Sequence, residues 1–149
     1  MPIDAYSLCP GGTGKKIKFC CPDLLPELEK IVRMMDGEQT LAALNHVEHV
    51  LEKHPDRACL LALRAELLRA AGRLDDLVPH AAHFLEAHPE NQLAWAESAI
   101  AASVSGDLRR AIDCVYRSME YVNEQLYPVA YDAMRIVAQA AVAHKAWEA

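Results

Sequence analysis

The sequence predicts an all-α protein in which antiparallel helical hairpins follow a short irregular N-terminal segment. Two observations carry this prediction. The lone glycines Gly72 and Gly106 are 34 residues apart, and Ala65, Ala99 and Ala133 recur at the same interval. Between these markers, apolar residues return every three or four positions, which is the spacing of one helix face. A fixed period of this length indicates two-helix units that stack on one another.

Composition and charge narrow the class of protein. The chain has 149 residues, of which 52% are apolar or aromatic, enough for one modest core with at most a small appendage. Its net charge of -6, from 15 Lys and Arg against 21 Asp and Glu, argues against extended nucleic-acid binding. No apolar run approaches the ~18 residues that a bilayer span needs, and the N-terminus lacks the layout of a signal peptide. We therefore expect a cytoplasmic protein with no membrane contact.

Two segments of different charge make up the chain. Residues 1–21 hold three lysines against one aspartate, for a charge of +2, whereas residues 22–149 carry -8. We expect a knuckle of cysteines and lysines over residues 1–22 and helical repeats over residues 23–149. The repeats divide into approximate units at 23–55, 56–89 and 90–123, with an incomplete unit at 124–149.

Each helix is predicted from its apolar spacing and its end signals. The first covers residues 23–35, with Asp23 as its N-cap and Gly37 at its end. The others are predicted over residues 41–53, 58–71, 74–87, 92–105, 108–122 and 126–144. Glycine supplies the positive φ that ends the first helix of a hairpin, and proline closes the second. Pro79 falls inside a predicted helix, where it removes one hydrogen bond, so we expect it to kink or delay that helix.

This layout resembles the tetratricopeptide repeat (TPR) family, whose 34-residue pattern is W-x2-L-G-x2-Y…A-x3-F…P. Trp95 holds the Trp place, and the three alanines at the 34-residue interval hold the Gly place. The remaining places are filled by apolar residues: Leu61, Val129, Leu68, Ala102, Ile136, Ala43, Leu77, Ala111, Val47, Ala81 and Val115. The resemblance implies a right-handed α-solenoid of about three to four TPR-like hairpins, whose first helices line a concave channel.

The same resemblance implies which side chains face a partner. The channel positions are Ala62, Glu66, Arg69, Leu93, Ala96, Ile100, Ser103, Tyr127 and Met134. Only Arg69 could pair with an anion, so an apolar or amphipathic segment of a protein is the expected ligand. The alternative is that these residues pack against further repeats. The predicted last helix also leaves apolar residues uncovered, which indicates either a fragment of a longer solenoid or self-association through that helix.

The N-terminal segment carries a second motif, Cys9-Pro-Gly-Gly-Thr-Gly-Lys-Lys-Ile-Lys-Phe-Cys20-Cys21. It resembles the SEC-C motif, C-P-C-G-S-G-K-K-Y-K-K-C-C or C-H, which folds around zinc. The resemblance implies that Cys9, Cys20 and Cys21 are zinc ligands and that Lys15, Lys16 and Lys18 form a second partner contact.

Gly11 departs from the motif, because it stands where the second thiolate should be. A structural zinc ion takes four ligands in a tetrahedron, so the fourth must come from elsewhere, such as water, Asp4, Asp23 or another chain. The alternative is a degenerate knuckle that keeps only the turn and the basic loop. A disulfide between the adjacent Cys20 and Cys21 is strained and suits a reducing cytosol poorly.

Other candidate sites are weaker. The run GGTGKK lacks two of the four fixed positions of a phosphate-binding loop and follows no strand, which argues against nucleotide binding. His46 and His49, like His80 and His83, share a helix face, but their 34-residue recurrence favours half-exposed surface residues. We expect Cys59 and Cys114 to be small buried or half-buried residues, because neither has a local His/Asp arrangement that would activate a nucleophile.

These observations favour a non-catalytic adaptor: a helical solenoid that presents a partner surface, with a basic, zinc-bound knuckle as a second contact. Two alternatives stay open. The chain could be an N-terminal targeting or assembly fragment of a larger enzyme or regulator, or its three thiols could serve in metal transfer or redox chemistry.

Overall fold

The structure, a computed structural model that describes residues 2–144, is all-helical, and the predicted fold class is confirmed at that level. The elements are α1 (Ile17–Cys20), the 3-10 helix η1 (Pro22–Leu24), α2 (Leu25–Asp36), α3 (Thr40–Lys53), α4 (Ala58–Ala70), α5 (Leu74–Ala87), α6 (Gln92–Val104), α7 (Leu108–Glu120) and α8 (Pro128–Ala143). No strand occurs within these residues. The partner helix predicted to open at residues 145–149 lies outside the described residues.

The helix ends follow the predictions except at two prolines. Asp23 is not the cap of the first long helix: it lies in η1, and α2 begins at Leu25 with Pro26 in its first turn. Proline suits that position because the N–H it lacks would have no partner there. Pro79 does not delay α5, which begins at Leu74 and runs through it. Only the one hydrogen bond toward the carbonyl of Asp75 is lost.

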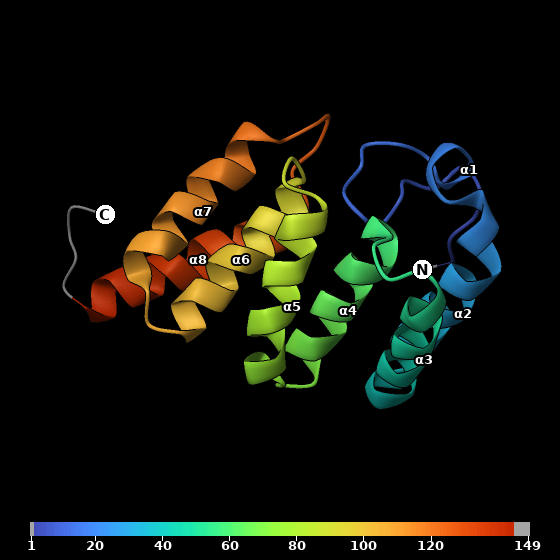
Figure 1. Ribbon diagram of the computed structural model, residues 1–149, viewed down its shortest axis with the longest axis horizontal. Helices are drawn as coiled ribbons and strands as arrows, with labels where there is room; N and C mark the ends of the chain where they lie inside the picture. Colours follow the sequence, from blue (N-terminus) through green and yellow to red (C-terminus); the bar gives the residue numbers. More distant parts are fainter. Residues whose placement is uncertain (1, 145–149) are drawn as a thin grey trace. The chain divides into compact units, whose positions relative to one another are not determined.

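The chain forms two compact units, residues 1–73 and residues 74–149, which are described separately. In the first, α2 packs against α3 and α3 packs against α4. The knuckle before α2 shares this core: Ile17 is fully buried in one cluster with Leu28, Leu44 and Leu60. Figure 1 shows the blue N-terminal loop beside the first turn of α4. The knuckle is therefore continuous with the helical core and does not stand apart as an appendage.

In the second unit α6 is the central helix, because it contacts α5, α7 and α8. Its sequence is apolar almost all round, and small residues such as Ala96 and Ala99 are completely buried. Small side chains let neighbouring helices approach closely, while the fully buried Phe84 of α5 fills core volume.

The turns that end the first helices share one backbone conformation at a 34-residue interval. Gly72 and Gly106 have φ of 69° and 79°, in the left-handed region. In the first hairpin the equivalent position is Glu38, with φ of 58°, whereas Gly37 has φ of -85°. The prediction that Gly37 supplies the left-handed turn is therefore wrong by one residue. The 34-residue period belongs to the backbone conformation, and in the first hairpin a non-glycine residue adopts it.

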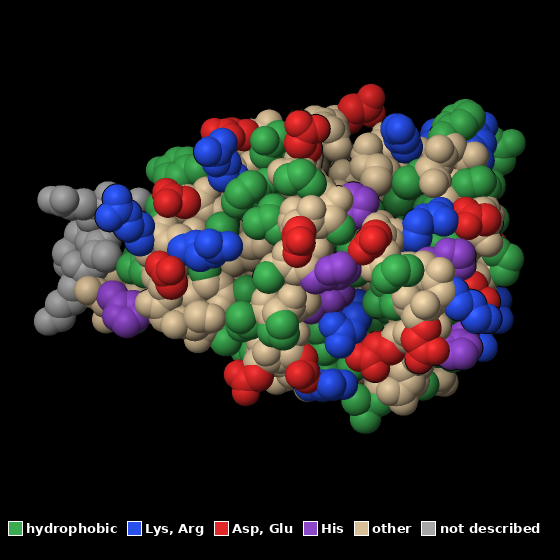
Figure 2. All heavy atoms as spheres, in the orientation of Figure 1, with side chains coloured by type: hydrophobic (Ala, Val, Ile, Leu, Met, Phe, Trp, Pro, Cys, Tyr) green, Lys and Arg blue, Asp and Glu red, His purple; other side chains and the backbone are tan. Residues whose placement is uncertain are grey.

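The surface is mixed in charge. On the face shown in Figure 2, acidic and basic side chains are interspersed, and neither sign covers a continuous area. Among the helices that the structure describes, none combines the length and the apolar content required to cross a bilayer.

Candidate metal centre

The cysteines of the knuckle are brought together by a tight turn and a single turn of helix. Leu8 and Lys16 form an isolated antiparallel bridge, and the N–H of Cys9 donates to the carbonyl of Lys15 at 2.8 Å. Gly12 and Gly14 lie between them with φ of 71° and 72°, a conformation that glycine adopts without strain. Helix α1 then returns the chain so that Cys20 and Cys21 face Cys9.

The three sulfur atoms are spaced as a metal site requires. The Sγ of Cys20 lies 3.3 Å from the Sγ of Cys9, and the Sγ of Cys21 lies 3.7 Å from it. All three lie within 4.8 Å of one another. Two thiolates on one tetrahedral zinc ion, each at about 2.3 Å, would be separated by about 3.8 Å. All five cysteines of the chain are free thiols, so no disulfide competes for these sulfur atoms.

Two polar groups support negative charge on the sulfur atoms. The backbone N–H of Gly11 donates to the Sγ of Cys9 at 3.4 Å, and the hydroxyl of Thr13 donates to the Sγ of Cys20 at 3.4 Å. Hydrogen bonds of this kind favour the thiolate, which is the form that binds a metal ion.

The protonation of the thiols is strongly interdependent. Hydrogen bonds from the thiols of Cys21 and Cys59 lower the pKa of Cys9 to about 2, against the effect of its burial. The pKa of Cys21 is raised, because its thiol hydrogen is held by Cys59 and Cys9. Burial raises the pKa of Cys20. One thiolate is therefore shared among several thiols, whose protons a metal ion would displace.

Cys59 is the residue of this cluster that the sequence analysis missed. It is the second residue of α4 and is 2% exposed, as expected for a small buried residue. Its thiol is hydrogen-bonded to Cys9 and Cys21, although the motif gives it no role. The available signal was indirect: a cysteine is missing at position 11, and a cysteine without a local partner begins the next long helix but one.

The carboxylates considered as a fourth ligand are engaged elsewhere. Asp4 accepts hydrogen bonds from the backbone N–H groups of Tyr6 and Ser7 at 2.8 and 3.0 Å. Asp23 accepts two hydrogen bonds from the guanidinium of Arg57, both at 2.9 Å, and Arg57 holds the pKa of Asp23 below its usual value. This ion pair joins η1 to the residue before α4.

The lysines of the knuckle lie over aromatic rings. The Nζ of Lys18 is 4.3 Å from the ring centre of Tyr6 and 4.8 Å from that of Phe19, and the Nζ of Lys16 is 5.9 Å from the Tyr6 ring. Tyr6 and Phe19 are largely exposed, as are Lys15 and Lys16. The basic loop therefore forms the outer surface of the knuckle, while the thiols face inward.

The predicted channel residues are distributed over both units. Ala62, Glu66 and Arg69 belong to α4, whereas Leu93, Ala96, Ile100 and Ser103 belong to α6, and Tyr127 and Met134 belong to the α8 region. Ala62, Leu93, Ala96 and Ile100 are buried, the side chains of Arg69, Ser103, Tyr127 and Met134 are half-buried, and Glu66 is exposed. The structure therefore supports no single channel across these positions.

The histidines form no metal set. Among residues 2–144, the cysteine cluster is the one group of His, Cys, Asp or Glu ligand atoms gathered closely enough for a metal ion. His46 is hydrogen-bonded to Glu27, and His49 and His83 are exposed. His80 is 6% exposed, so the prediction of a half-exposed surface residue is wrong there. It faces the core because it follows the fully buried Leu77 by three residues on the same face of α5.

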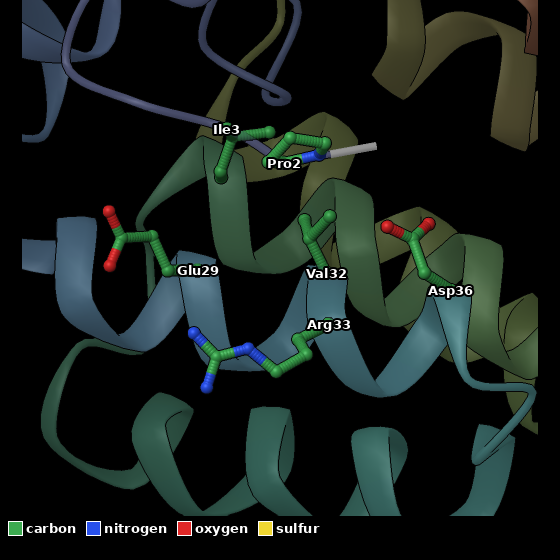
Figure 3. Close-up of a pocket in the computed structure, with 6 residues that line it drawn as sticks. All are labelled: Pro2, Ile3, Glu29, Val32, Arg33 and Asp36. Atoms are coloured by element: carbon green, nitrogen blue, oxygen red, sulfur yellow. The ribbon is translucent and has the colours of Figure 1, made fainter.

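Two hollows lie away from the cysteines. In the first unit a cavity of about 340 Å³ lies between Pro2 and Ile3 on one side and α2 on the other (Figure 3). Its lining mixes apolar residues with Glu29, Arg33 and Asp36 and includes no thiol. In the second unit α7 and α8 enclose a groove of about 240 Å³ without charged side chains, lined by Ile112, Val115, Tyr116, Met134, Val137, Ala138 and Ala141.

Comparison of the chain with models of protein families, with curated proteins and with solved structures gave no match.

Proposed function

We propose that this protein is a non-catalytic adaptor in which a zinc-bound, SEC-C-like knuckle is built onto TPR-like helical hairpins. The observation that carries the proposal is the convergence of the Cys9, Cys20 and Cys21 sulfur atoms within 4.8 Å. Soft thiolate ligands at tetrahedral spacing suit zinc, and such closed sites are structural. The metal holds a segment whose apolar content is too small to fold unaided.

The zinc site is tested by metal analysis of the whole protein purified without chelator. We expect about one zinc per chain. Cys20 is the half-buried thiol of the cluster, so it should resist alkylation until a chelator is added. Cys114, buried in the second unit, provides the internal control, since chelator should not change its reactivity. Metal-free protein with a freely reactive Cys20 would contradict the proposal.

The adaptor role is supported by the apolar groove between α7 and α8. Its lining has no charged side chain, and Tyr116 is 64% exposed beside it. A surface of this kind fits the apolar face of an amphipathic helix, which binds by burial of side chains at helical spacing. The partner we propose is therefore an amphipathic helical segment of another protein.

The groove is tested by selecting helical peptides from a library on the native protein. Peptides with an apolar stripe should be enriched and should bind the Ala138→Glu variant at least about tenfold more weakly, the factor that corresponds to 1.4 kcal/mol. Gln139→Glu is the matched control, because it adds the same charge at a neighbouring exposed residue of α8 outside the groove lining. Equal binding to both variants would exclude this groove as the docking surface.

A further inference from the structure

The start of α4 occupies the place that the missing motif cysteine leaves open. A Cβ atom on Gly11 would lie 2.5 Å from the backbone nitrogen of Cys59 and 2.6 Å from the carbonyl carbon of Ala58. The backbone of the knuckle is therefore in direct contact with the first turn of α4. No side chain fits at position 11, and the residue beside it carries a thiol.

The Cys59 thiol belongs to the same buried cluster as the motif cysteines. Cys9, Cys21 and Cys59 are each no more than 2% exposed and lie in one core. Cys59 is hydrogen-bonded through its side chain to both Cys9 and Cys21. Cys20 reaches the group through its 3.3 Å contact with Cys9. Four sulfur atoms from three segments of the chain thus meet at one place.

The surroundings of Cys59 suit a thiolate ligand. It occupies the second position of α4, and the partial positive charge of a helix N-terminus stabilises an anionic sulfur atom. The guanidinium of Arg57 lies close by, and its bidentate pair with Asp23 fixes the start of α4 against η1. These groups offset part of the negative charge that four thiolates would place around one divalent ion.

We propose that Cys59 is the fourth ligand of a tetrahedral four-cysteine zinc site with Cys9, Cys20 and Cys21. This inference rests on the proposed zinc-binding function and specifies the site. Gly11 and Cys59 are then a paired change: the ligand is moved from the turn to α4, and the vacated position becomes glycine so that α4 can approach. The zinc ion joins the knuckle directly to the helical hairpins, in place of closing a self-contained loop.

The coordination number can be measured on the unmodified protein. X-ray absorption at the zinc edge should give four sulfur ligands at about 2.3 Å and no oxygen or nitrogen ligand near 2.0–2.1 Å. Three sulfur ligands with one lighter ligand would overturn the assignment of Cys59 while leaving the zinc-binding function intact. Absence of zinc from the purified protein would overturn the proposed function itself.

A variant identifies the fourth sulfur atom. Cobalt(II) titration of Cys59→Ala should show a sulfur-to-metal charge-transfer band reduced by about one quarter, and metal affinity lowered by more than the 10- to 100-fold typical of outer-shell partners. Cys114→Ala removes an equally buried thiol from the second unit and should match the unmodified protein. If Cys59→Ala does not fold, Cys59→His should restore folding with one nitrogen ligand in the absorption spectrum. Cobalt binding by Cys59→Ala with unchanged affinity and band intensity would overturn the proposal.

Discussion

Replacing Gly11 by alanine is expected to lower the free energy of unfolding of the first unit by about 3 kcal/mol, the upper end of the usual range for overpacking. The added Cβ would lie 2.5 Å from a backbone nitrogen and 2.6 Å from a backbone carbon of α4. Backbone atoms of a helix cannot move aside as the end of a flexible side chain can. Gly11 is not among the glycines with positive φ, so the expected loss comes from space alone and not from backbone conformation.

Gly37→Ala is the matched control for this substitution. Gly37 also has an ordinary φ, of -85°, and its added Cβ would lie 3.4 Å from the nearest atom, the carbonyl oxygen of Arg33. We expect its urea midpoint to stay level or to rise slightly, because alanine restricts the unfolded chain. If Gly11→Ala and Gly37→Ala unfold at the same urea concentration as the unmodified protein, the close approach of knuckle and α4 is contradicted.

Removal of the metal is expected to have a still larger effect. Binding of a structural zinc ion contributes about 10 kcal/mol or more to the folded state of small zinc domains. Because Ile17 and Leu24 of the knuckle belong to the core of the first unit, loss of the ion should loosen α2 and α4 as well. Hydrogen exchange of the backbone amides with and without a strong chelator measures this directly. The amides of Ile17, Cys21 and the first turns of α4 should lose protection.

Two controls make the chelation result specific. The amides of α6 belong to the second unit, whose described residues contain no cluster of metal ligands, and their exchange should not change. Adding back zinc should restore protection, whereas magnesium, which prefers oxygen ligands, should not. Chelation that leaves the exchange of residues 9–24 unchanged would show that the knuckle folds without a metal ion.

The helices could be predicted from the sequence because their signals are local. Apolar spacing and the glycines at 72 and 106 give α4 to α7 to within two residues at each end. The first hairpin was harder, because Glu38 adopts the left-handed conformation beside a glycine that does not. The presence of a glycine predicted the turn, but the choice between adjacent residues depends on hydrogen bonds such as that from Gln39 to the carbonyl of Met34.

The candidate site could be predicted only in part. Cys9, Cys20 and Cys21 lie within one short motif, so their convergence follows from the local turn and α1. Cys59 is 38 residues beyond Cys21, and no spacing rule brings it to the knuckle. Its place depends on how α2, α3 and α4 pack, which is tertiary information. The absence of a cysteine at position 11 pointed to a ligand from elsewhere, but the sequence did not identify the donor.

The shared core of the knuckle and α4 sets an order of events during synthesis. Cys9, Cys20 and Cys21 leave the ribosome first, and the residue that covers Gly11 follows 38 residues after Cys21. At 5–20 residues per second, the thiols wait roughly 2–8 s for α4. During that interval the nascent chain presents uncovered thiols and the apolar side chain of Ile17. Speed of translation through residues 22–59 therefore governs how long this segment is open to oxidation and to the wrong metal.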